Sequence, residues 1–110
     1  MSFWKTLFSG FRPDERRLLA RGWAPILELE IEGVRALSRD WSAGGAAIIG
    51  IEGDLAVGDI LAGTLGWEGS AGRVPFTADI VRIAPDGTIS LRWLELDRSM
   101  LRELDERAEN

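Results

Sequence analysis

The chain of 110 residues is 45% hydrophobic and 28% charged, which is typical of one globular domain with its own core. It contains neither Cys nor His, which excludes disulfides, the usual zinc and haem sites, and nucleophiles activated by a histidine. Its formal net charge of −5 argues against binding to long nucleic acid or to anionic membranes, and because neither a signal peptide nor an apolar run of about 20 residues is apparent, we expect a soluble, cytoplasmic protein without a membrane span.

Residues 1–13 form an amino-terminal arm whose apolar side chains recur at helical spacing. They are Phe3, Trp4, Leu7, Phe8 and Phe11. Gly10 and Pro13 keep this helix short, and a short helix is marginal in water unless it packs on something. Packing on its own domain is the simpler interpretation. The alternative is an arm that docks on a protein partner through Phe3, Trp4, Leu7 and Phe8.

Residues 14–22 form a charged connector that carries Arg16, Arg17 and Arg21. If the connector is helical, Arg17 and Arg21 share one face; if it is extended, they can reach a ligand from different points. A guanidinium is planar and always charged, and it binds phosphate or the guanine edge through paired hydrogen bonds. A solvated linker is the simpler alternative.

The following sequence predicts a series of short antiparallel strands, because apolar and polar residues alternate between turn signals. The expected strands cover 26–31, the run after Gly33, 46–51, 60–67, 74–83 and 89–96. Pro85-Asp86-Gly87 predicts a hairpin between the last two. After them, Asp97 or Ser99 can cap a short helix over about 98–108. This pattern predicts a small antiparallel barrel or sandwich.

The stretch Arg39-Asp40-Trp41-Ser42-Ala43-Gly44-Gly45 lies between two apolar runs. On a strand, Asp40 and Ser42 point to one face and Trp41 to the other, so we expect Trp41 in the core and the polar pair outside. A carboxylate can accept hydrogen bonds from guanine, a serine can donate or accept, and glycine permits a close approach. A strand-end turn with local hydrogen bonds is the simpler alternative.

Together, two of these motifs resemble the signature of the PilZ domain, a bacterial receptor domain for cyclic di-GMP. They are Arg17-x-x-x-Arg21 and Asp40-x-Ser42-x-x-Gly45. The resemblance extends from about residue 14 to 104 and implies a six-stranded antiparallel β-barrel with a short C-terminal helix. The implied parts are the arm, the barrel domain, its arginine loop and its helix, over residues 1–13, 14–110, 14–22 and about 98–108.

By the resemblance, the arginine pair clamps the phosphates and guanine bases of cyclic di-GMP, Asp40 and Ser42 read a guanine edge, and Gly45 leaves room for the ligand. Arg16 occupies a position that in the family influences how many ligand molecules bind. The implied ligand-binding residues are Arg16, Arg17, Arg21, Asp40, Ser42 and Gly45. No cofactor, metal ligand or catalytic residue is implied.

Two functions follow as alternatives. The first is a receptor whose arginine loop changes conformation on binding cyclic di-GMP and which signals to a protein partner. The second is a PilZ-like adaptor that acts through protein contacts alone, which the aromatic arm would support. Catalysis is disfavoured, because the acid pairs Asp54 with Asp59 and Glu103 with Asp105 stand beside no nucleophile or metal cluster.

Overall fold

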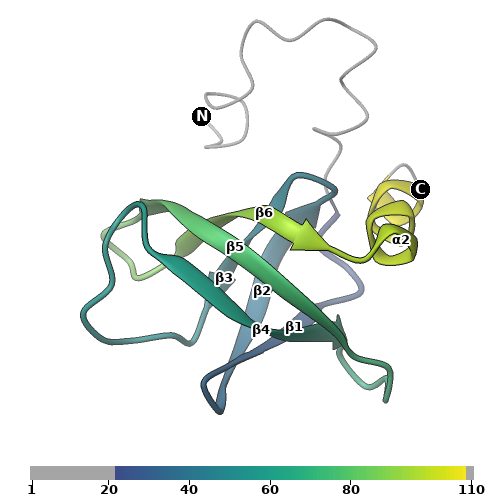
Figure 1. The fold of residues 1–110 in the computed structure, drawn as a ribbon, viewed down its shortest axis with the longest axis horizontal. Coiled ribbons are helices and arrows are strands. Elements are labelled where there is room, and N and C mark those ends of the chain that lie inside the picture. Colours follow the sequence, from purple (N-terminus) through teal and green to yellow (C-terminus); the bar gives the residue numbers. More distant parts are fainter. Residues whose placement is uncertain (1–21, 109–110) are drawn as a thin grey trace, which may run out of the picture.

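The computed structural model describes residues 22–108. In this part of the chain, six antiparallel strands form a closed barrel and one helix follows them (Figure 1). The elements are β1 (Leu27–Ile31), β2 (Val34–Ser42), β3 (Gly45–Ile49), β4 (Ile60–Trp67), β5 (Val74–Ile83), β6 (Ile89–Leu96) and α2 (Arg98–Ala108). The predicted six-stranded antiparallel barrel with a C-terminal helix is therefore confirmed. No helix among residues 22–108 is long and apolar enough to cross a membrane.

The strands follow one another around the barrel in the order β1-β2-β3-β6-β5-β4, and β4 pairs with β1 to close it. Each of these six strands thus has two hydrogen-bonded neighbours. Closure satisfies the backbone groups that an open sheet leaves at its edges.

The first hairpin shows how the local sequence determines the strands. Leu27, Leu29 and Ile31 are buried, as their alternation with glutamates predicts. Glu32 and Gly33 then both have positive φ, 52° and 80°. This is the geometry of a two-residue type I′ turn, which matches the twist of the strands that it joins.

The helix α2 packs on the barrel through Met100 and Leu104, which are buried. It begins at a cap made by Asp97, whose Oδ2 accepts hydrogen bonds from the backbone N–H groups of Ser99 (3.0 Å) and Met100 (3.3 Å). Of the two predicted capping residues, Asp97 has this role. The hydroxyl of Ser99 also donates to Asp97, and these hydrogen bonds lower the pKa of Asp97.

Candidate functional site

A β-bulge in β2 determines which side chains of the stretch 39–45 face the core. Ser38 lies opposite Ile48 of β3, but the next pair is Asp40 with Ala47, so that Arg39 is the extra residue. An extra residue reverses the alternation that follows it. Trp41 therefore points into the barrel, where it is 0% exposed, and Asp40 points outward. The prediction that Trp41 is a core anchor is confirmed.

Trp41 also holds the segment that leads into the barrel. Its backbone N–H donates to the carbonyl of Gly22 and its carbonyl accepts from the N–H of Gly22, both at 2.9 Å. Its indole Nε1–H donates to the carbonyl of Pro25 at 2.8 Å, and its ring meets that of Trp67 edge-on at 5.0 Å. A Cβ on Gly22 would lie under 3.0 Å from three atoms of the Trp41 ring, so only glycine fits there.

Gly22 is the last residue of the arginine connector. Its pairing with Trp41 fixes that end of the connector between the two polar residues Asp40 and Ser42. The structure thus brings the residue that follows Arg21 to the strand that carries the second motif, although the two are far apart in the sequence.

The second motif forms a tight turn with Ser42 beneath it. Ser42 pairs with Gly45, and the hydroxyl of Ser42 accepts a hydrogen bond from the N–H of Gly44 at 3.0 Å. Asp40 is half-buried on the outer side of β2. The expectation that Ser42 lies outside beside Asp40 is wrong: Ser42 is 0% exposed, and its hydroxyl is engaged in the local turn.

Trp93 of β6 stabilises the same turn, and the sequence did not single it out. Its indole Nε1–H donates to the carbonyl of Ser42 at 3.1 Å, and its backbone N–H donates to the carbonyl of Gly44 at 3.0 Å. Its ring packs edge-on against Phe76 at 5.6 Å. Alternation in β6 places Trp93 on a strand, but only the pairing of β3 with β6 shows that it supports the turn.

Arg92 is the second residue of β6 at this site that sequence reasoning missed. It is the cross-strand neighbour of Gly45 on one side and of Asp79 on the other. Its guanidinium donates to both carboxylate oxygens of Asp79, Nε to Oδ1 at 3.1 Å and Nη2 to Oδ2 at 2.7 Å. These bonds raise the pKa of Arg92, and its side chain remains 47% exposed. A fixed cation therefore stands beside Gly45.

Of the six predicted ligand-binding residues, the structure brings together Asp40, Ser42 and Gly45. Arg16, Arg17 and Arg21, like the apolar residues of the arm, lie outside the described residues. Their roles stay predictions.

The acid pairs considered for catalysis have structural contacts. The Oδ2 of Asp59 accepts from the N–H of Ala56 at 2.9 Å. The Oε1 of Glu103 accepts from the indole of Trp67 at 2.7 Å and lies 3.4 Å from Arg107. Within residues 22–108, no three acidic, His or Cys side chains gather as a metal site would require.

Comparison with known proteins adds a family and a set of folds. The family model of the PilZ domain matches residues 12–109, whereas no curated protein matches the sequence. Among solved structures, the inhibitor of motility MotI/DgrA of Bacillus subtilis is 23% identical with a TM-score of 0.67, covering 82% of this chain and 47% of that chain. This chain thus spans about half of the MotI/DgrA chain.

Two further structures are PilZ domains. The PilZ domain of YcgR from Escherichia coli, solved with c-di-GMP, is 17% identical with a TM-score of 0.54, over 78% of this chain and 80% of that one. The PilZ domain of CeSA from a cellulose-synthesizing bacterium is 22% identical with a TM-score of 0.51, over 79% and 91%. At these identities the likeness is one of fold.

Proposed function

Because the chain belongs to the PilZ domain family, as the match over residues 12–109 shows, we propose that it is a cytoplasmic receptor for cyclic di-GMP. One observation carries the proposal. Gly22, the residue after Arg21, pairs with Trp41, which lies between Asp40 and Ser42 in β2; this pairing would let both halves of the signature act on one ligand. The PilZ domain of YcgR, which has the same fold, was solved with c-di-GMP.

The chemistry of the residues suits a ligand with two phosphates and two guanines. Arg17 and Arg21 would bind phosphate oxygens and guanine bases through charge-assisted hydrogen bonds, and Arg16 would influence how many ligand molecules bind. The carboxylate of Asp40 would accept from the N–H groups of a guanine edge. The whole protein can remain acidic, because the cations that matter are local.

Ser42 and Gly45 would act mainly by shape. Ser42 accepts from Gly44 and so holds the turn, while its hydroxyl proton can still be donated. Gly45 presents no side chain, which lets a base approach the backbone. Arg92, held by Asp79 beside Gly45, would add a positive charge to this face without having to be ordered first.

Binding would be reported to a protein partner by a change of the arginine loop and of the arm that precedes it. In this proposal the protein is not an enzyme, and ligand binding shifts the population of a two-state element. The second candidate is an adaptor that binds no nucleotide and works through protein contacts of Phe3, Trp4, Leu7 and Phe8. The apolar spacing of those four residues favours it.

Calorimetric titration with cyclic di-GMP separates the two candidates. A receptor should bind in the micromolar range, and cyclic di-AMP should bind at least about tenfold more weakly, because adenine cannot give Asp40 the paired donors of guanine and would leave its carboxylate unsatisfied. Absence of heat at high micromolar cyclic di-GMP would favour the adaptor, and equal binding of both nucleotides would remove Asp40 as a reader of guanine.

A further inference from the structure

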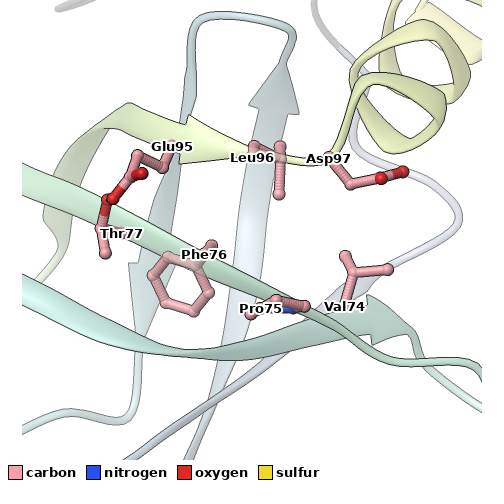
Figure 2. A pocket seen from close by; sticks show the side chains of 7 residues that line it. All are labelled: Val74, Pro75, Phe76, Thr77, Glu95, Leu96 and Asp97. Carbon is pink, nitrogen blue, oxygen red and sulfur yellow. The ribbon is translucent and has the colours of Figure 1, made fainter.

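A pocket of about 440 Å³ opens across β5 and β6, where β6 leads into α2 (Figure 2). Four of its lining residues are apolar and three carry polar side chains. They are Val74, Pro75, Phe76 and Leu96, and Thr77, Glu95 and Asp97. An apolar lining with a few polar groups and a volume of several hundred Å³ is typical of a site that holds another molecule.

The polar side of the pocket is acidic. Glu95 is exposed, and its carboxylate accepts from the hydroxyl of Thr77 at 3.3 Å. Asp97 is held by its capping bonds to the first turn of α2. Arg73, which precedes the pocket in the chain, does not neutralise these acids, because its guanidinium donates to the carbonyls of Ser70 and Gly72 and to Glu28.

The apolar floor of the pocket is connected to the turn at Ser42. Phe76 packs edge-on against Trp93 at 5.6 Å. Trp93 in turn donates hydrogen bonds to the carbonyls of Ser42 and Gly44. An occupant of the pocket would therefore contact a residue only one aromatic ring away from the candidate nucleotide site.

We propose that this pocket docks a short segment of a partner protein, in which an apolar side chain is flanked by Lys or Arg. The apolar side chain would sit against Val74, Phe76 and Leu96, and the cation would lie at Glu95 and Asp97. Charge complementarity selects this occupant: two fixed carboxylates at an apolar hollow, on a chain with a net charge of −5, attract a basic segment and repel a second copy of this acidic chain. Docking itself does not depend on the proposed function; only its consequence for nucleotide signalling rests on that function.

The test uses the full, ¹⁵N-labelled chain without cyclic di-GMP, so that its outcome is independent of nucleotide binding. The probe is the capped peptide acetyl-Lys-Leu-Phe-Arg-amide, and its matched control is acetyl-Glu-Leu-Phe-Glu-amide. We expect the basic peptide to bind with a Kd of about 1 mM and to shift the amide resonances of Val74, Phe76, Thr77 and residues 95–97. Equal binding of the acidic peptide, or shifts confined to other residues, would overturn the proposal.

Two charge reversals sharpen the test. Glu95→Lys should weaken binding of the basic peptide by about fivefold or more, the size of an ion pair. The melting temperature of this variant should stay near that of the wild type. Glu52→Lys makes the same charge change in the loop after β3, which leaves the barrel beside the start of β6 and not at its end, and should leave peptide affinity unchanged. An equal loss in both variants would mean general charge attraction and would contradict the pocket.

The docking proposal would also be overturned if the pocket held a second copy of the chain or the amino-terminal arm of the same chain. If the amide resonances of Val74, Phe76, Thr77 and residues 95–97 move with protein concentration in the absence of peptide, a second copy fills the pocket. If they move in a Trp4→Ala variant and not with the peptide, the arm of the same chain fills it.

Discussion

Gly22 and Trp41 are joined in two ways. Their backbones exchange two hydrogen bonds of 2.9 Å, and the buried indole ring fills the space that a side chain at residue 22 would need. This contact is the point where the arginine connector meets the Asp40–Ser42 pair, so disturbing it should affect stability and ligand binding together.

Gly22→Ala is the direct test of this contact. The added methyl group would overlap the Trp41 ring, which cannot move freely because it is 0% exposed. Such overpacking costs about 1–3 kcal/mol of the free energy of unfolding, measurable by urea denaturation, and we expect weaker binding of cyclic di-GMP by calorimetry. The control is Gly72→Ala, where nothing lies within 4 Å of the new Cβ. If Gly22→Ala resembles this control, the anchor is unimportant.

Removing the arginines should affect binding and leave the fold intact. Arg17→Ala and Arg21→Ala should each weaken the binding of cyclic di-GMP by about 2 kcal/mol or more, the scale of a charge-assisted contact. That is about 30-fold in Kd. Thermal stability should barely change, since in this proposal these side chains contact the ligand and not the core. Arg102→Ala on the exposed side of α2 provides the control. Wild-type affinity in both connector variants would remove the arginine loop from the site.

The neighbours Asp40 and Trp41 should respond in opposite ways. Asp40→Ala should reduce ligand affinity in a folded protein, because Asp40 points out of the barrel. Trp41→Ala should cost about 3–5 kcal/mol of the free energy of unfolding, the usual cost of deleting a fully buried aromatic side chain. Denaturation and calorimetry on both variants separate the two effects. A stable Trp41→Ala variant would contradict the packing described above.

Ligand binding should also slow amide hydrogen exchange in the connector. Ordering a residue costs about 1–2 kcal/mol of backbone entropy, whereas micromolar binding leaves a net gain of only about 8 kcal/mol. The contacts of the arginines with two phosphates must therefore supply that net gain and, in addition, the entropy cost of ordering the connector. We therefore expect new protection over residues 14–21 when cyclic di-GMP is added, beyond that which Gly22 has from its hydrogen bond to Trp41. Should the ligand bind without added protection there, the loop switch fails while the receptor assignment survives.

The helix cap predicts a loss of stability in acid. Hydrogen bonds from the Ser99 hydroxyl and from the backbone N–H groups of Met100 and Ser99 hold the pKa of Asp97 below its ordinary value of 3.8. A carboxylate whose pKa is lower in the folded state stabilises the fold above its unfolded pKa and loses this effect as the pH falls through its folded pKa. Asp97→Asn keeps a good cap but not the charge. The melting temperature of the wild type should exceed that of Asp97→Asn at pH 7, and the difference should shrink below about pH 4. A constant difference down to pH 3 would show that the charge is not responsible.

The strands and their turns were predictable because their signals are local. Alternation identified β1 and β4 to β6, and the Pro85-Asp86-Gly87 turn marked the last hairpin. The site was harder, because its geometry depends on pairings between distant parts of the chain. No local pattern shows that Arg92 and Trp93 of β6 lie beside the turn at Gly45, or that Ser42 is buried. The arginines of the connector stood out by their clustering, but their assignment to the ligand site came only from the resemblance.

The bulge at Arg39 makes the pairing register of β2 as important as its composition. If β2 paired with β3 as a regular ladder that kept Arg39 in register, strict alternation would continue from Ser38 onward. The carboxylate of Asp40 would then point into the barrel interior and the indole of Trp41 into water, at a large cost in desolvation. Deleting Arg39 would remove the bulge and leave both orientations as they are, so the core should tolerate that deletion better than a one-residue insertion between Asp40 and Trp41, which would turn the indole outward.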